Sequence, residues 1–110
     1  MFSRELKKGS TELLILSLLE GGPRHGYDIG KMIELRSRGK LQLRIASLYP
    51  MLCRLESRDL IRGRWLERPG ERRRRFYRLT SEGRRMLVSE RANWREFILA
   101  VNRVVGRGHA

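Results

Sequence analysis

The stretch that decides the fold of this chain covers residues 46–56 and reads ASLYPMLCRLE. Leu48, Leu52 and Leu55 recur in it at helical spacing, which predicts one short helix with an apolar face. The opposite face carries small or polar side chains and a single long cation, namely Ser47, Pro50, Arg54 and Ser57. A helix with a narrow exposed side is suited to close approach to another molecule. The same pattern also fits an ordinary core helix with a solvated back.

The start of this helix is predicted at Ser47, because a serine hydroxyl accepts a hydrogen bond from an unpaired N–H of the first turn. Pro50 then falls in that turn, where its missing N–H removes no helix bond. The helix is expected to end near Asp59. Residues 41–45 alternate apolar and polar side chains, which predicts a short extended segment ahead of the helix.

The composition is strongly basic, because 25 Lys and Arg stand against 12 Asp and Glu in 110 residues, a formal net charge of +13. A chain of this length forms one domain with a modest core and room for one appended element. The charge predicts an acidic polymer or an anionic membrane surface as partner. Most of the cations are arginines, which favour planar, bidentate contacts with phosphate. The few aromatic residues disfavour a stacking platform for single strands.

The chain has one cysteine, Cys53, so no internal disulfide forms and a reducing, cytoplasmic setting is expected. Cys53 lies beside the apolar stripe and is interpreted as a small residue at the edge of the core, with a redox role as the alternative. The two histidines, His25 and His109, are far apart and belong to no Cys/His cluster, so we expect no metal and no cofactor. The apolar segment 13–19 is too short to span a bilayer.

Two further helices are predicted before the central stretch. Residues 1–9 are polar and basic and are expected to form a loosely held arm. A helix then opens at Ser10 or the next residue and ends at the Gly-Gly-Pro of residues 21–23. Apolar side chains cover most of its circumference, so it must be buried on more than one side. The second helix is predicted over residues 25–36, with His25 as a capping or packing residue.

A β-hairpin is predicted after the central stretch. Residues 60–66 and 73–79 have strand character, and the turn at 68–71 contains Pro-Gly. The tip and the second strand carry a run of arginines, Arg72, Arg73, Arg74 and Arg75. Helices followed by a basic hairpin are the order of a winged helix-turn-helix module, in which the hairpin is the wing. The expected fold class is therefore mainly α with a small β-hairpin.

A last helix is predicted from the Thr-Ser-Glu-Gly of residues 80–83 to about Val105. Apolar residues recur along it at spacings of three, four and seven, namely Leu87, Trp94, Phe97, Ile98, Val101, Val104 and Val105. The distal half has no obvious partner in its own chain, so we expect a two-fold homodimer. Residues 1–80 then form a winged helix-turn-helix DNA-binding domain, and residues 81–110 form a C-terminal dimerisation helix with a frayed tail.

Four motifs occur in order, namely Gly26-Tyr27 at a helix start, Leu48-Tyr49-Pro50-x-Leu-x-Arg54-Leu55-Glu56, Leu60-Ile61, and Arg74-x-Phe76-Tyr77-x-Leu79-Thr80-x-x-Gly83. With these motifs the chain resembles the PadR family of bacterial and archaeal transcriptional regulators. The single short C-terminal helix is similar to that of the compact subfamily. This resemblance implies a homodimeric winged-helix repressor whose dimers form through the last helix with help from the first.

The third helix is expected to enter the major groove of double-stranded DNA by its N-terminal end. Ser47 and Arg54 are the candidates for contacts with base edges or phosphates. Arg44 and the wing arginines, Arg72, Arg73, Arg74 and Arg75, are expected to follow phosphates or to reach the minor groove, and so to set affinity and salt dependence. The resemblance implies that the Tyr49 hydroxyl donates to a DNA phosphate. The alternative is that Tyr49 packs under the wing with a solvated hydroxyl.

The dimer seam is expected to contain Leu87, Trp94, Phe97, Ile98, Val101 and Val104. In the small-ligand-sensing members that this chain resembles, a similarly placed tryptophan lines a pore between the subunits. The resemblance therefore implies that a planar aromatic effector stacks between the paired Trp94 side chains. The alternative is a plain tryptophan of the dimer core that binds no ligand.

Other classes of function fit parts of the sequence. The charge also fits a basic protein that binds RNA or DNA without specificity, but the winged module order and the apolar last helix argue against it. A basic amphipathic last helix also fits a membrane-surface protein, although we expect no membrane contact. The sequence has no paired carboxylates, no nucleophile with a base and no phosphate-cradling glycine loop, so we do not expect an enzyme.

Overall fold

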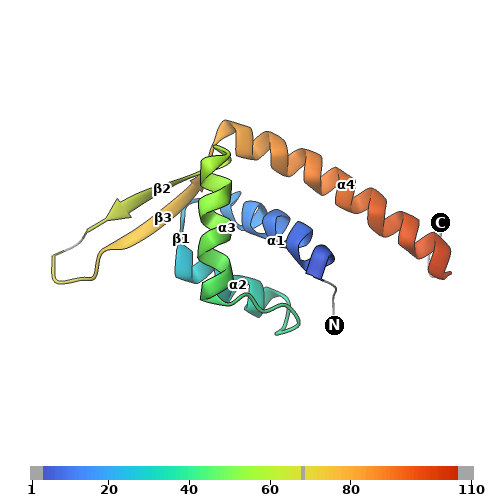
Figure 1. Ribbon diagram of the computed structural model, residues 1–110, viewed down its shortest axis with the longest axis horizontal. Helices are drawn as coiled ribbons and strands as arrows, with labels where there is room; N and C mark the ends of the chain where they lie inside the picture. Colours follow the sequence, from blue (N-terminus) through green and yellow to red (C-terminus); the bar gives the residue numbers. More distant parts are fainter. Residues whose placement is uncertain (1–3, 68, 107–110) are drawn as a thin grey trace.

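The computed structural model describes residues 4–67 and 69–106, with side chains from residue 10 onward (Figure 1). Its elements are α1 (Arg4–Leu19), β1 (Arg24–His25), α2 (Gly26–Arg36), α3 (Ile45–Ser57), β2 (Ile61–Leu66), β3 (Arg74–Leu79) and α4 (Ser81–Val105). Helices α1, α2 and α3 and the foot of the hairpin form a head, and α4 runs away from it (Figure 1). This architecture confirms the expected class, which is mainly α with a small β-hairpin.

Helix α1 starts at Arg4, so the prediction of a loose arm is wrong for residues 4–9, and residues 1–3 lie outside the described part of the chain. The segment contains Glu, Leu and Lys, which are good helix formers and extend the helix backwards from its buried part. Ile15, Leu16, Leu18 and Leu19 are all buried, as expected for a helix covered on more than one side.

The sheet has three antiparallel strands in the order β1-β3-β2, so β2 is an edge strand. Strand β1 was not predicted, because two residues are too few to show the alternation typical of a strand. It places His25 opposite Phe76 and at the start of α2. The Nδ1 atom of His25 accepts a hydrogen bond from the N–H of Tyr27 at 3.2 Å, which confirms its capping role.

Helix α3 starts at Ile45, with Arg44 as its N-cap, so the prediction of Ser47 as N-cap is wrong. The carbonyl of Arg44 accepts hydrogen bonds from the N–H groups of Ser47 and Leu48, at 2.9 and 2.8 Å. Pro50 consequently lies inside the helix, beyond the first turn, and cannot donate to the carbonyl of Ala46 on the exposed face. Residues 41–44 form no strand, and the helix ends at Ser57, before the left-handed Asp59.

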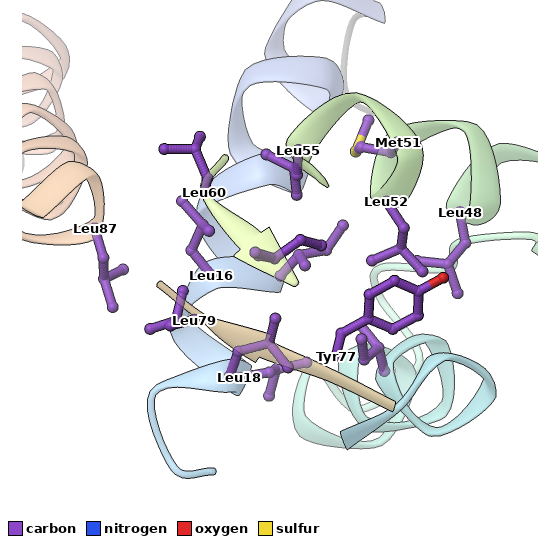
Figure 2. Close-up of a cluster of buried hydrophobic side chains, with 14 of the residues drawn as sticks. Leu16, Leu18, Leu48, Met51, Leu52, Leu55, Leu60, Tyr77, Leu79 and Leu87 are labelled. Atoms are coloured by element: carbon purple, nitrogen blue, oxygen red, sulfur yellow. The ribbon is translucent and has the colours of Figure 1, made fainter. Parts of the chain in front are cut away.

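The core lies between α1, α2, α3 and the sheet, and a single α4 leucine reaches it (Figure 2). Its members are Ile15, Leu16, Leu18, Leu19, Ile29, Ile33, Leu48, Met51, Leu52, Leu55, Leu60, Ile61, Tyr77, Leu79 and Leu87. The predicted stripe of α3 lies deep in this core, because Leu52 and Leu55 are fully covered. This packing fixes which side of α3 faces outward.

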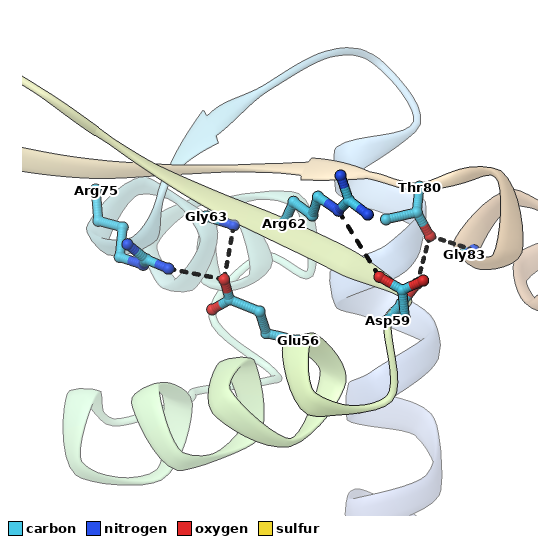
Figure 3. A network of polar contacts seen from close by, with 7 residues as sticks. All are labelled: Glu56, Asp59, Arg62, Gly63, Arg75, Thr80 and Gly83. Atoms are coloured by element: carbon cyan, nitrogen blue, oxygen red, sulfur yellow. Dashed lines mark hydrogen bonds and ion pairs between the residues drawn. The ribbon is translucent and has the colours of Figure 1, made fainter.

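The first turn of α4 is fixed to the end of α3 (Figure 3). The Thr80 hydroxyl donates to the carbonyl of Asp59 at 2.6 Å and accepts from the N–H of Gly83 at 2.9 Å. A side chain at residue 83 would overlap the carbonyl of Leu60, so only glycine allows this approach. Thr80 is thus the N-cap, where the sequence left Thr80 and Ser81 as alternatives, and the helix reaches the predicted Val105. No helix in residues 4–67 and 69–106 is both long and apolar enough to cross a membrane.

Candidate nucleic-acid interface

The outward face of α3 is a row of small residues. Ala46, Pro50, Cys53 and Ser57 follow each other at spacings of four, three and four, and all are exposed. Sequence reasoning found Pro50 and Ser57 but missed Ala46 and Cys53, although the helical spacing was visible. The prediction that Cys53 lies at the edge of the core is wrong, because the burial of Leu52 and Leu55 turns the intervening residue outward.

Polar side chains border this row on one side. Ser47 and Arg54 lie seven residues apart, hence on the same side of α3, and both are exposed. Arg44 is exposed at the N-terminus of the helix. Within the described part of the chain, no carboxylate pairs with Arg44 or Arg54. The structure therefore brings these predicted contact residues together along one edge and leaves the two cations free for an external anion.

Tyr49 borders the row on the other side, toward the wing. A Cβ at residue 26 would lie 3.2 Å from the Tyr49 ring and 3.3 Å from the Tyr77 ring, so glycine at the start of α2 lets both tyrosines pack there. The Tyr49 side chain is nevertheless 36% exposed. Packing against α2 and access for a phosphate are thus compatible in this geometry.

The arginine run at the wing is divided by the alternation of β3. Arg75 lies opposite Trp65 and Arg74 opposite Leu66, so the neighbouring guanidinium groups leave the sheet on different faces. Arg73 pairs with Glu67 at 3.0 Å and stacks over Trp65. Arg72 and Arg74 are exposed and pair with no described carboxylate. The four cations therefore differ in their pairing, and Arg72 and Arg74 are the most available for contacts with phosphates.

A hollow of about 750 Å³ separates α3 from the wing. Its lining combines cations with aromatic and polar side chains, namely His25, Tyr27, Tyr49, Cys53, Glu56, Trp65, Tyr77 and the arginines at 72–75. Burial raises the pKa of Tyr77, although the nearby Arg75 acts in the opposite sense, so its hydroxyl stays protonated at neutral pH. Such a lining can hold an anionic backbone by charge and hydrogen bonding.

The distal half of α4 presents an apolar stripe to solvent. Trp94, Phe97, Ile98, Val101 and Val104 are all exposed, and the rings of Trp94 and Phe97 lie 5.7 Å apart. Leu87, predicted for the same seam, is only 1% exposed and belongs to the core of its own chain. The stripe that a second molecule can reach therefore begins at Trp94.

Helices α1, α2 and α3 are followed by a β-hairpin wing, and α3 has an exposed outward face. These features define the class of winged helix-turn-helix proteins. Residues 15–89 match the transcriptional regulator PadR-like family, and the chain belongs to this family. It is thus a DNA-binding transcription regulator and not an enzyme.

Solved structures agree with this assignment. A transcriptional regulator from Clostridium thermocellum is 29% identical, with a TM-score of 0.84 over 94% of this chain and 97% of that chain. A PadR family transcriptional regulator from Eggerthella lenta is 31% identical, with a TM-score of 0.81 over 94% of this chain and 88% of that one. Bacillus subtilis PadR in complex with operator DNA is 26% identical, with a TM-score of 0.65 over 71% of this chain and 44% of that chain.

Proposed function

We propose that this chain is a homodimeric transcriptional repressor, acting in the cytoplasm, that binds a palindromic operator. The observation that carries the proposal is the small outward row of α3 lying between two sets of free cations, Arg44 and Arg54 on the helix and Arg72 and Arg74 on the wing. The similar Bacillus subtilis PadR structure contains operator DNA, which supports a DNA target here.

The proposed roles follow the local chemistry. Ser47 and Arg54 read base edges or hold phosphates, and a bidentate contact of arginine with guanine contributes about 1–3 kcal/mol of discrimination. Arg44 and the Tyr49 hydroxyl hold phosphates beside the helix. Arg72 and Arg74 supply most of the wing's attraction for the backbone, which is independent of sequence.

The proposed dimer forms through the exposed stripe of α4, so that residues 1–80 act as the DNA-binding head and residues 81–110 as the dimerisation segment. Its support is the exposure of Phe97, Ile98 and Val101, which a second copy would cover. Two heads must then reach major grooves about 34 Å apart. A small rotation of α4 relative to its partner would spoil that spacing.

A planar aromatic effector is proposed at the same seam, with Trp94 as its contact. The partial exposure of Trp94 beside Phe97 supports this role, and a plain core tryptophan is the alternative. The chain has two tryptophans, so Trp65→Phe leaves Trp94 as the single reporter. We expect saturable quenching of its fluorescence by planar aromatic compounds, with loss of operator binding. Quenching that does not saturate would support the alternative.

The test of the main proposal is selection of bound sequences from a random duplex pool, followed by titration of the selected duplex at several salt concentrations. We expect a palindrome whose half-sites lie about one helical turn apart, and affinity that falls steeply with salt. Equal competition by unrelated RNA and by unrelated duplex DNA would instead indicate a non-specific nucleic-acid-binding protein.

A further inference from the structure

Glu56, at the end of α3, connects the recognition helix to both strands of the wing (Figure 3). Its Oε2 atom accepts one hydrogen bond from the N–H of Gly63 on β2, at 3.0 Å, and another from Nη2 of Arg75 on β3, at 2.7 Å. Both side chains of this ion pair are about 30% exposed. A charge-assisted pair that is partly shielded from water is stronger than an ordinary surface pair.

Gly63 makes this arrangement geometrically feasible. A Cβ at residue 63 would overlap the guanidinium of Arg75, so the bare backbone of β2 is what lets Arg75 reach Glu56. Because β2 is the edge strand, the N–H of Gly63 that bonds Glu56 belongs to the unpaired edge of the sheet. The carboxylate therefore satisfies an edge N–H and an arginine at once.

Two aromatic rings also lie near the Arg75 guanidinium, whose carbon is 5.4 Å from the Trp65 ring centre and 5.6 Å from that of Tyr77. Arg74, the preceding residue, alternates to the other face of the strand, although it also borders the hollow beside α3. It is exposed and pairs with no described carboxylate. Two adjacent arginines of one strand thus have different surroundings. Arg75 is bonded to Glu56 of its own chain, whereas Arg74 is available for an external anion.

We propose that Glu56, Gly63 and Arg75 form a clamp that sets the direction of the wing relative to α3. In this clamp Arg75 is a positioning residue and does not neutralise a phosphate. The inference rests on the proposed DNA-binding function, since it assigns Arg74 and Arg75 different parts in the same interface. The hairpin extends away from the head and is attached at its foot, where the clamp lies (Figures 1 and 3).

The first experiment measures how operator affinity depends on salt for Arg75→Ala and for the matched variant Arg74→Ala. We expect Arg74→Ala to reduce the slope of log K against log salt by about 0.9, the effect of one lost phosphate contact. Arg75→Ala is expected to keep the wild-type slope and to weaken binding about five- to tenfold, because a loosened wing must be ordered on binding. An equal fall in slope for both variants would overturn the proposal.

A double-mutant cycle tests whether the members act as a unit. Glu56→Ala, Gly63→Ala and Arg75→Ala should weaken binding by similar factors, and Glu56→Ala with Arg75→Ala should be no weaker than either alone. Glu56→Gln should recover part of the loss, since its amide oxygen still accepts from Gly63 and Arg75. Losses that multiply would show that Glu56 and Arg75 act separately and would overturn the clamp.

A measurement without DNA separates this inference from the proposed function. In the free protein, the amide of Gly63 should exchange with solvent about tenfold faster after Glu56→Ala, the effect expected for one lost hydrogen bond. The amide of the neighbouring Arg62 serves as the control for unfolding. Unchanged exchange at Gly63 in a folded variant would overturn the clamp, whereas failure to bind any duplex with the exchange effect intact would overturn only the DNA-binding proposal.

Discussion

Helices α3 and α4 carry the same kind of apolar stripe, but the stripe is buried in α3 and exposed in the distal half of α4. In α3 the stripe is formed by Leu48, Leu52 and Leu55, each no more than 1% exposed. In α4 the corresponding residues Phe97 and Val101 are 48% and 38% exposed. Periodicity therefore predicts that a helix has a face to bury, but it does not say what will bury it.

The difference arises because α4 extends beyond the part of the chain that could cover it. Helix α4 has 25 residues, which at about 1.5 Å per residue makes it longer than the 29 Å middle dimension of the molecule. Its first two turns meet the head through Gly83 and Leu87, which are buried. Beyond them only Glu20, in the turn after α1, is hydrogen-bonded to α4, through Arg91, among the residues that the structure describes. Four variants test this difference between the two helices.

The largest effect is expected from Phe97→Asp combined with Val101→Asp. Two carboxylates in the exposed stripe should convert the proposed dimer into monomers, with loss of about a hundredfold in operator affinity, because two linked heads bind far better than one. Analytical ultracentrifugation and duplex titration measure the two effects. Val88→Asp is the matched control, because Val88 is exposed on the opposite side of α4 and its replacement should leave the dimer intact. An unchanged dimer mass in the double variant would place the interface elsewhere.

Leu52→Ala tests the buried stripe of α3. It should lower the free energy of unfolding by about 2–5 kcal/mol, because it leaves a cavity in a fully covered site. Urea denaturation followed by circular dichroism measures this loss. Cys53→Ala, at the adjacent exposed position, should change stability by less than about 0.5 kcal/mol. If the two variants were equally stable, the two faces of α3 would not differ as described.

Gly83→Ala tests the joint at which α4 leaves the head. The added methyl would overlap the carbonyl of Leu60, so we expect a loss of about 1–3 kcal/mol in unfolding free energy from the forced backbone shift. Ser89→Ala, at an exposed position of the same helix, provides the comparison in the same denaturation experiment. A Gly83→Ala variant as stable as Ser89→Ala would mean that α4 is not held closely at its first turn.

The smallest effect is expected at the ion pair of Glu20 and Arg91, which lies at the edge of the buried region. Hydrogen bonding to Arg91 and its charge lower the pKa of Glu20 below the usual 4.5. The pair therefore contributes stability above that pH and loses it as the pH falls through the lowered pKa. Thermal unfolding should show Glu20→Gln slightly less stable than wild type at neutral pH, with the difference disappearing at a pH low enough to protonate Glu20. A constant difference at both pH values, or the same difference for Glu96→Gln, would contradict this account.

Much of the fold was predictable because its signals are local. The stripe of α3, the Pro-Gly turn of the hairpin and the Thr80 cap each depend on neighbours a few residues apart. The N-cap of α3 was predicted three residues too late, at Ser47 and not at Arg44, because a serine hydroxyl is only one way to satisfy a first turn. Here Arg44 caps the helix with its backbone, and the hydroxyl of Ser47 is left on the exposed face.

The candidate site was less predictable. The sequence shows four consecutive arginines but not that Arg75 bonds to Glu56, a residue 19 positions away. It shows Leu87 in register with Trp94 but not that only Leu87 reaches the core of its own chain. Strand β1 and the clamp at Gly63 were missed for the same reason, since each is defined by a partner distant in sequence.

The sequence by itself determined the winged helix-turn-helix order, the basic character of the surface, and the existence of two amphipathic helices, because periodicity, capping and charge are properties of short segments. Only the tertiary structure decided which side of α3 faces outward, which arginines are free, and where along α4 burial stops. These outcomes depend on which distant residues the packed core brings within a few ångströms of one another, and no local pattern contains that information.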